Sequence, residues 1–387
     1  MTKEEFMVLA SEKYETLQKL NDHLNFYDYE QAFDELWTEL GRTVLERNIG
    51  EIPKDHRKKN IIRTRYGKIE VGKIHSFSEP VLGSRTSPYL QEKLVLLGCQ
   101  NVFNSVPKVV ESLLGISVNE SQVYRICQAV SNQIDDKELD SPSVGLEVIE
   151  NAGEECVYGM VDGSMLSTDA GWQECKVGRV FKAEMLENSD PYKWEMGQSD
   201  YVACRGHYSL FTEKFELLLP PTSLCQKVFI TDGAVWIGNW ISRSYEKSTQ
   251  ILDFFHVTEK LAVAAKTTDN ATEWLEKQKN ILLKGKRKKV YKAIEKLPFF
   301  EDESKNKLLN YLKNNAYRMK YDQYRQRGLM ISSGPIESAH RTVLQIRMKL
   351  SGQYWSEAGC DKMIKLRVAY RSEKFDIITN ILKNSVA

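Results

Sequence analysis

Three acidic residues stand where their carboxylates could carry out chemistry. Asp162 follows the buried strand pattern VYGMV, Asp232 follows KVFIT and precedes a helix, and Glu337 lies near the start of the last helix pattern. The carboxyl ends of neighbouring strands meet at one sheet edge, where α/β proteins bind ligands. Three like charges gathered there are unfavourable unless divalent cations neutralise them, and hard oxygen ligands favour Mg²⁺ or Mn²⁺. Two such ions about 3.5–4 Å apart would activate an attacking oxygen and stabilise a leaving oxygen at phosphorus.

The two Asp-Gly sequences also have a plain structural reading. Asp-Gly after a strand is common turn chemistry, and VDG or TDG taken singly is best read that way. The coincidence of two such strand ends with a glutamate on the polar face of a helix favours the metal site instead.

Basic residues gather in two segments although the whole chain is balanced, with 54 Lys and Arg against 53 Asp and Glu. The balance excludes a protein that grips nucleic acid with its entire surface. The segment IIRTRYGKIEVGKIH predicts a short β-hairpin that turns at Tyr66-Gly67 and has one cationic face. Either a solvated surface or a phosphate-contacting ribbon explains it. We expect the following residues to contact DNA: Arg57, Arg63, Arg65 and Lys68 of this segment, Lys286, Arg287 and Lys288 of GKRKKVYKAIEK, and Arg341 and Arg347 after Glu337.

A helix-turn-helix pattern lies within residues 88–134. Pro107 begins VPKVVESLL, Gly115 ends it, and Ser117 with Glu120 forms a capping box for the next helix. On the exposed face of this second helix, Asn119 and Ser121 accompany three residues that we expect to hydrogen-bond bases or phosphates: Gln122, Tyr124 and Arg125. Paired short helices also occur in ordinary bundles, so a purely structural role stays open.

The length and composition indicate a globular chain of two to three domains. The 387 residues include 42% hydrophobic and 28% charged residues. Seven scattered cysteines with no Cys-x-x-Cys pair predict neither disulfides nor a zinc knuckle. The acidic, amphipathic start MTKEEFMVLASEKYE does not suit a signal peptide, and no apolar run reaches about 18 residues. We therefore expect a cytoplasmic protein.

The elements that must position the acids are predicted as an α/β fold with a mixed sheet. Three β-rich runs, CVYGMVDGSML, VGRVFKAEML and DYVACRGHYSLF, precede a strand-helix-strand-helix pattern. In the last helix, Ile336, Ala339, Val343, Ile346 and Leu350 predict one buried stripe after a cap at Ser333. Residues 135–155 read as an acidic linker. The expected parts are an N-terminal helical region (1–53) for packing or oligomerisation, a basic hairpin (54–80), a helix-turn-helix region (81–140), a catalytic domain (150–268 and 328–387) and a basic helical insertion (269–327).

Four runs carry a specific resemblance: YGMVDGSML, VFITDGAVWIGNWI, ILDFFHVTEKL and SSGPIESAHRTVLQIRMKLSGQYWS. They resemble bacterial insertion-sequence transposases of the Asp-Asp-Glu class, especially the Mutator-like group. The resemblance covers residues 150–265 and 330–370 and implies a ribonuclease-H-like fold with a helical insertion before the third acid. It implies that Asp162, Asp232 and Glu337 are the metal ligands. It also implies that the Asp253-x-x-His256 element contributes His256 to the active site, near the scissile phosphate.

The resemblance implies a DNA transposase that holds two Mg²⁺ or Mn²⁺ ions. Such an enzyme binds double-stranded DNA at the element ends, cleaves it and transfers the freed 3′-hydroxyl to target DNA, as a homodimer or higher oligomer. Rival hypotheses are a metal-dependent nuclease without strand transfer and a helix-turn-helix regulator with an idle site. A sugar or phosphate enzyme with a glycine-rich loop is disfavoured because the sequence has no such loop. Two further residues are secondary: His340 is a weak ligand candidate, and Trp355 fits a buried core residue better than a base-stacking one.

Overall fold

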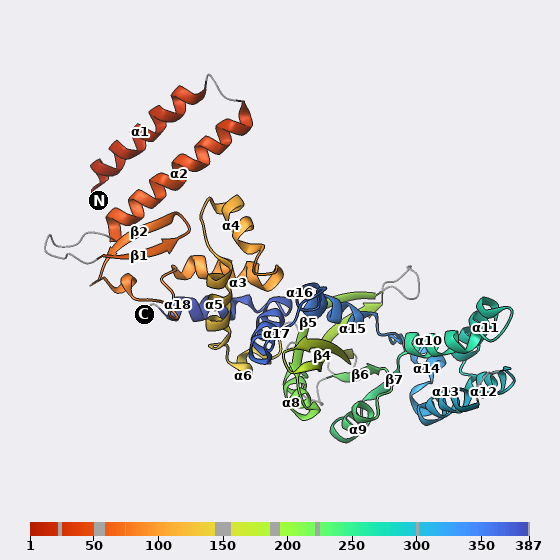
Figure 1. The fold of residues 1–387 in the computed structure, drawn as a ribbon. Coiled ribbons are helices and arrows are strands. Elements are labelled where there is room, and N and C mark those ends of the chain that lie inside the picture. The colour runs from red at the N-terminus through yellow and green to blue at the C-terminus, as the bar shows by residue number, and fades with distance from the viewer. Residues whose placement is uncertain are drawn as a thin grey trace. The chain divides into compact units, whose positions relative to one another are not determined.

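A computed structural model describes residues 1–21, 25–49, 59–73, 75–143, 156–185, 194–220, 225–298 and 302–385. The chain divides into two compact units, Met1–Leu139 with Ala358–Ala387, and Asp140–Glu357 (Figure 1). The sequence pattern places residues 358–387 in the catalytic domain, whereas in the structure they pack within the N-terminal unit. The guanidinium of Arg367 donates to the carbonyl of Cys99 at 2.8 Å, deep in that unit.

The N-terminal unit begins with two helices, α1 (Lys3–Asn21) and α2 (Phe26–Ile49), which confirms the predicted helical region. They run side by side as an antiparallel pair (Figure 1). Among their apolar residues, Leu17 and Leu40 are buried while several aromatic side chains remain exposed.

The basic hairpin forms as predicted, from β1 (Lys59–Thr64) and β2 (Gly67–Gly72). Its turn lies one residue earlier than expected, at Arg65-Tyr66, because Thr64 pairs with Gly67, whose φ of +104° suits glycine. The buried face of the hairpin packs on α2 and contains Ile62, Ile69 and Val71. A short 3-10 turn, η1 (Ser76–Ser78), follows.

The remaining helices of this unit are α3 (Pro88–Gln100), α4 (Val106–Leu114), α5 (Glu120–Ser131), α6 (Asp136–Leu139), α17 (Glu357–Arg371) and α18 (Phe375–Asn384). The first residue of α17, Glu357, is counted with the second unit. Gly115 ends α4 in the left-handed conformation, as predicted. The predicted capping box is wrong: Asn119, not Ser117, caps α5 by accepting the amide of Gln122.

The second unit contains a five-stranded mixed sheet in the order β5-β4-β3-β6-β7, which confirms the predicted α/β class. The strands are β3 (Cys156–Thr168), β4 (Gly171–Met185), β5 (Trp194–Arg205), β6 (Gln226–Thr231) and β7 (Thr249–Leu252). The first three strands are antiparallel neighbours, and β6 runs parallel to both β3 and β7. Contrary to prediction, Asp162 does not end its strand but lies in the middle of β3.

Three helices follow individual strands: α8 (Tyr208–Leu218), α9 (Val235–Ser244) and α10 (Phe254–Ala265). The run HYSLF was expected to continue a strand. Instead His207 caps α8 by accepting the amide of Ser209. Phe215 of α8, Phe229 of β6 and Trp240 of α9 belong to one buried cluster with the sheet residues Val157 and Val161. Because side chains alternate along a strand, Asp162 points to the opposite face from Val161.

The predicted basic insertion is helical and contains α11 (Ala271–Leu283), α12 (Arg287–Glu295), α13 (Asp302–Asn314), the 3-10 turn η2 (Ala316–Arg318) and α14 (Tyr321–Gln326). Part of the expected acidic linker is not a solvent-exposed connection but is packed into the second unit. Asp140 is buried in an ion pair with Lys214, and Ser143 donates its amide and hydroxyl to buried Asp200. Residues 144–155 of that segment lie outside the described residues.

The last helix pattern contains α15 (Gly334–Ala339), a π-helical turn labelled η3 (His340–Gln345) and α16 (Ile346–Met348). The predicted buried stripe holds to Val343 and then fails, since Ile346 and Leu350 are exposed. A π turn has more residues than an α turn, so it rotates the following side chains about the axis. Leu344, Arg347 and Met348 are buried instead. Within the described ranges, no helix has both the length and the apolar character needed to cross a membrane.

Candidate functional site

Asp162 forms the centre of the candidate site, on the face of the sheet that α15 covers. The helix contacts β3 and β4, and Arg179 of β4 holds it there by donating to the carbonyl of Pro335 at 3.0 Å. At the start of the π turn, Nε2 of His340 lies 3.3 Å from Oδ2 of Asp162. His340 is buried and Asp162 is partly exposed, so the carboxylate has one side toward the protein and one toward solvent.

The pKa of Asp162 reflects this half-buried position. Burial by itself raises the pKa, but the adjacent imidazole of His340, the Gly163 amide and the nearby imidazole of His256 together bring it below the ordinary value. The carboxylate is therefore ionised at neutral pH and is available as an anionic ligand.

Glu337 shares a hollow with Asp162. The hollow has a volume of about 560 Å³ and is lined by both acids together with His340 and Arg341. Glu337 occupies the first turn of α15, where a negative charge is favoured by the helix dipole. Arg341 is exposed at the rim, one turn beyond Glu337, as the sequence predicted. Two of the three predicted acids thus line one concave, polar surface.

Asp232 directly follows the neighbouring strand β6, at the level of Asp162. The register pairs Met160 with Ile230 across parallel β3 and β6, so Asp162 and Asp232 each follow that pair by two residues. Asp232 accepts the amide of Ala234 at 2.9 Å, and its carbonyl accepts the hydroxyl of Tyr311 at 2.7 Å. Asp232 is not among the residues that line the hollow.

The Asp253-x-x-His256 element lies at the end of the next strand, β7. Asp253 is buried and accepts from the amides of Phe255 and His256, and from both the amide and hydroxyl of Ser333. The Ser333 hydroxyl also lies 3.3 Å from a Glu337 oxygen. Ser333 was predicted as a helix cap. Its side chain does not cap α15 but joins β7 to that helix, through Asp253.

Burial raises the pKa of Asp253 despite these hydrogen bonds. His256 is partly exposed, and its Nδ1 lies 3.7 Å from a carboxylate oxygen of Glu259. Sequence reasoning placed His256 at the site through the resemblance. The structure places its charge near enough to Asp162 to lower that pKa.

The donor atoms suit a hard divalent cation, since Asp162, Asp232 and Glu337 offer only carboxylate oxygens. In the described part of the chain, no three His, Cys, Asp or Glu side chains gather closely enough to form a metal site. The backbone brings the three predicted acids to one region of the sheet without drawing their carboxylates into one cluster.

The predicted DNA contacts of the N-terminal unit differ in their exposure to solvent. Arg57 lies outside the described residues. Arg65 and Lys68 are exposed on the hairpin, and Tyr124 and Arg125 are exposed on α5, as a surface contact requires. Arg63 is partly exposed, with Lys68 directly opposite in the register.

Two predicted contacts are wrong because their side chains are buried. Gln122 is 7% exposed, and its amide donates to the hydroxyl of Thr86 at 2.7 Å. Arg347 is 1% exposed, and its guanidinium lies 5.1 Å from the ring centre of Trp355. The π turn is the cause for Arg347, because it rotates this residue from the exposed to the buried face. Trp355 is a buried core residue, as favoured from the sequence.

The basic insertion also forms a concave cationic surface. Lys286, Arg287 and Lys288 lie at the start of α12. Facing sides of α11 and α12 enclose a hollow of about 410 Å³ that is lined by Trp274 and by four lysines, Lys277, Lys289, Lys292 and Lys296. Of these lysines, Lys277 of α11 was not identified from the sequence. Lys289, Lys292 and Lys296 follow one another at steps of three and four residues, which places them on one side of α12 and its C-cap.

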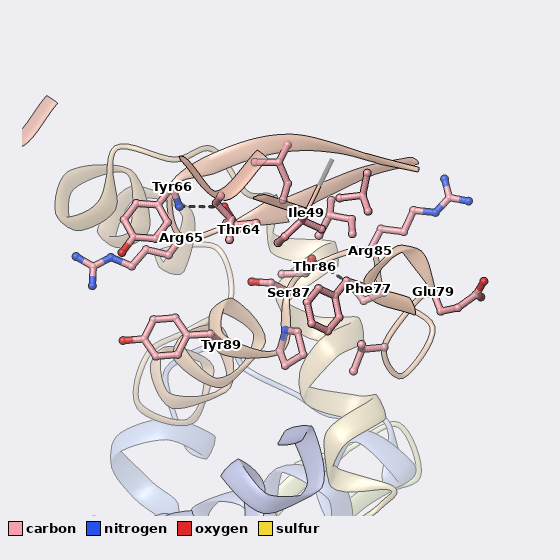
Figure 2. A pocket seen from close by; sticks show the side chains of 17 residues that line it. Ile49, Thr64, Arg65, Tyr66, Phe77, Glu79, Arg85, Thr86, Ser87 and Tyr89 are labelled. Carbon is pink, nitrogen blue, oxygen red and sulfur yellow. Dashed lines mark hydrogen bonds between the residues drawn. The ribbon is translucent and has the colours of Figure 1, made fainter. Parts of the chain in front are cut away.

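An apolar hollow that sequence reasoning missed lies beneath the hairpin in the N-terminal unit. It has a volume of about 360 Å³ and is lined by residues of α2, the hairpin, the following loop and the start of α3. Figure 2 shows Phe77 and Ile49 toward this hollow, whereas the side chains of Arg65 and Arg85 extend outward on opposite sides. The hairpin therefore has an apolar underside and cationic margins.

Comparison with known proteins adds no relative. No model of a known protein family matches the chain, and no curated protein is significantly similar to it in sequence.

Proposed function

We propose that the chain is a metal-dependent DNA transposase of the Asp-Asp-Glu class with a ribonuclease-H-like catalytic unit. The observation that carries the proposal is the placement of the acids. Asp162 of β3 and Asp232, directly after the adjacent parallel strand β6, each follow the last pair of the register by two residues, and Glu337 lines the same hollow as Asp162. An antiparallel trio of strands joined to two parallel strands is compatible with the fold that the resemblance implies.

The roles of the residues follow from their surroundings. Asp162, Asp232 and Glu337 would hold two Mg²⁺ or Mn²⁺ ions, which when bound supply Lewis acidity at the scissile phosphorus. Asp232 and Glu337 would need to turn toward Asp162, since the three carboxylates are not clustered. Asp253 and Ser333 would orient Glu337 through the hydrogen bonds that link β7 to α15. Arg341, at the rim of the hollow, is placed to bind a non-bridging phosphate oxygen.

The surfaces that would bind DNA are cationic and lie on separate elements. The hairpin and α5 provide exposed basic side chains in one unit, and the lysine-lined hollow of α11 and α12 provides basic side chains in the other. Phosphate contacts of this kind make affinity fall steeply with salt. Both element ends must be held together during transfer, so a homodimer or higher oligomer is proposed.

The test is a strand-transfer reaction with purified protein, a DNA fragment bearing the element ends, a target plasmid and Mg²⁺. We expect joined products from the wild type, and a loss of at least about 100-fold in Asp162→Asn, Asp232→Asn and Glu337→Gln, since each removes a charge that holds the ions. Glu246→Gln, an exposed acid after α9, is the matched control and should retain activity.

Other products would assign the chain differently. Nicks without joining would indicate a nuclease, and DNA binding with neither product would indicate a regulator. Full activity in all three acid variants would refute the catalytic assignment.

A further inference from the structure

Three arginines from three separate segments line one hollow in the N-terminal unit. Arg63 of β1, Arg85 of the following loop and Arg125 of α5 surround a space of about 300 Å³, together with Asn119 and Gln122. No acidic side chain of the described residues lines this space. Within the described ranges, none of the three arginines forms an ion pair with a carboxylate. Sequence reasoning identified Arg63 and Arg125 as separate contacts and did not identify Arg85.

The backbone joins the first two arginines directly. The amide of Arg63 donates to the carbonyl of Arg85 at 2.9 Å, and the amide of Ser87 donates to the carbonyl of Arg63 at 2.8 Å. These bonds form a parallel bridge along the free edge of β1. The hairpin and the loop therefore move as one piece, and the relative position of Arg63 and Arg85 is fixed.

A buried polar network fixes this piece to α5. Thr86 is 2% exposed, and its hydroxyl accepts from the amide of Gln122 at 2.7 Å. Gln91 of α3 donates to the carbonyl of Thr86 at 2.8 Å and to that of Val81 at 3.1 Å. Arg125 lies one turn after Gln122, so the same network sets the distance from Arg85 to Arg125. Buried, hydrogen-bonded amide groups of this kind hold a surface in one geometry.

The loop that carries Arg85 also contains backbone strain. Val81 and Ser84 exchange two backbone hydrogen bonds around a two-residue turn, in which Leu82 has a φ of +50° and Gly83 a φ of +75°. A branched residue seldom adopts this conformation, and it persists only where the surroundings enforce it. Leu82 and Gly83 themselves line the hollow.

Among the described residues, no acidic side chain pairs with the arginines that line the hollow. Arg63 stands directly opposite Lys68 in the hairpin, and like charges across a strand pair are destabilising. Guanidinium groups present planar pairs of donors that match phosphate oxygens better than any other side chain does. Arg85 also lines the edge of the apolar hollow, and Figure 2 shows its side chain extending outward from there.

We infer that Arg63, Arg85 and Arg125 bind a single phosphate group, and that this phosphate belongs to the backbone of double-stranded DNA. The inference rests on the proposed DNA-binding function and refines it: the hairpin and the second helix of the helix-turn-helix act as one composite phosphate site. Gln122 is a positioning residue in this site rather than a DNA contact.

The experiment measures binding of a fluorescein-labelled duplex of arbitrary sequence to the full chain in EDTA, over a series of salt concentrations. Arg85→Ala should weaken binding about tenfold at moderate salt, because a charge-assisted hydrogen bond is lost. The triple alanine variant should lower the slope of log affinity against log salt by about 0.9, as expected for one phosphate. The three single effects should not add up, since the three side chains share one ligand.

Matched controls separate the site from general charge and folding effects. Arg243→Ala removes an exposed arginine of α9 in the other unit and should leave affinity and slope unchanged. Arg85→Lys keeps the charge and should retain the slope while losing part of the affinity. Thermal unfolding checks that each variant is folded. Unchanged affinity and slope in folded Arg85→Ala would refute the site as a DNA contact.

A second arm tests the source of the phosphate. Stabilisation of the wild type by inorganic phosphate that is lost in Arg85→Ala, with duplex binding unchanged, would overturn the DNA assignment in favour of a free phosphate. Neither arm requires catalysis. If the binding results are as expected but no strand transfer occurs, the phosphate site is supported and the transposase proposal is refuted. If strand transfer occurs but Arg85→Ala binds duplex like the wild type, the transposase proposal is supported and the phosphate site on DNA is refuted.

Discussion

The carboxylate of Asp162 is balanced by the imidazole of His340, whose Nε2 lies 3.3 Å away. At the scale of residues this pair decides how the site responds to pH. The carboxylate lines a hollow with Glu337, a second negative charge that His340 and Arg341 offset. A cation entering the hollow would compete with the His340 imidazole for the same carboxylate oxygen.

The first prediction concerns the titration of Asp162. Its pKa in the folded protein is lowered, chiefly through His340 acting against burial. The stability that this carboxylate contributes is therefore present above its ordinary pKa, near 4, and is lost as the pH falls through the lowered value. We expect His340→Gln to raise the pKa of Asp162, as measured by NMR titration of the carboxyl carbons.

His75→Gln is the control, since His75 caps a 3-10 turn in the other unit and should leave Asp162 unchanged. The stability difference between wild type and His340→Gln should also shrink as the pH drops below 4. An unaltered Asp162 titration in His340→Gln would show that the pair does not set this pKa.

Partners such as His340 could not be predicted from residue types alone. The sequence pattern identified Asp162 because a carboxylate interrupts an apolar strand, and Glu337 because it lies on the polar face of a helix. The pairing with His340 depends on how α15 lies across the sheet, and the burial of Arg347 depends on the π turn that begins at His340. A helical wheel drawn at 3.6 residues per turn takes no account of this turn and places Arg347 on the exposed face.

At the scale of elements, Asp253 joins the sheet to the helix that carries Glu337. It follows β7, caps α10 through two amides and accepts two more hydrogen bonds from Ser333. The elements were predictable from apolar periodicity and turn residues, as the hairpin and the strand-helix alternation show. The joint was not predictable, because Ser333 and Asp253 are 80 residues apart.

The second prediction tests this joint. Asp253→Ala leaves three backbone amides and a buried hydroxyl without their acceptor, so we expect unfolding free energy to fall by about 2–4 kcal/mol. Chemical denaturation measures it. Asp269→Ala, an exposed acid after α10, should change stability by less than about 0.5 kcal/mol. A loss below 1 kcal/mol in Asp253→Ala would mean that water or neighbouring groups replace its hydrogen bonds.

At the scale of the whole molecule, the chain leaves its N-terminal unit and returns to it. Residues 358–387 pack there through contacts such as the Arg367 bond to Cys99 and the Ser131 bond to the carbonyl of Lys362. The sequence pattern groups this segment with the catalytic domain because it directly follows that domain in the chain. Contacts between residues more than 200 positions apart leave no local pattern, so this return could not be seen in advance.

The N-terminal helices present the surface that best fits the proposed oligomer. Phe26, Phe33 and Trp37 recur on α2 at steps of seven and four residues, which places them on one helical face. Their exposed fractions are 81%, 40% and 50%, and Phe33 packs edge-on against Trp37 with ring centres 5.7 Å apart. A row of exposed aromatic residues of this size marks a protein interface more often than a free surface.

We therefore expect the wild type to be a dimer or larger, and Phe26→Ser with Trp37→Ser to shift it toward monomer by at least about tenfold in dissociation constant. The reason is that each buried aromatic side chain contributes about 1.5–3 kcal/mol to association. Analytical ultracentrifugation measures the shift. Val235→Ser, which removes an exposed apolar residue from α9, is the matched control and should leave the assembly intact. A monomeric wild type would refute α2 as the contact between copies of the chain. The two element ends would then have to be held together by an oligomer that assembles only on DNA.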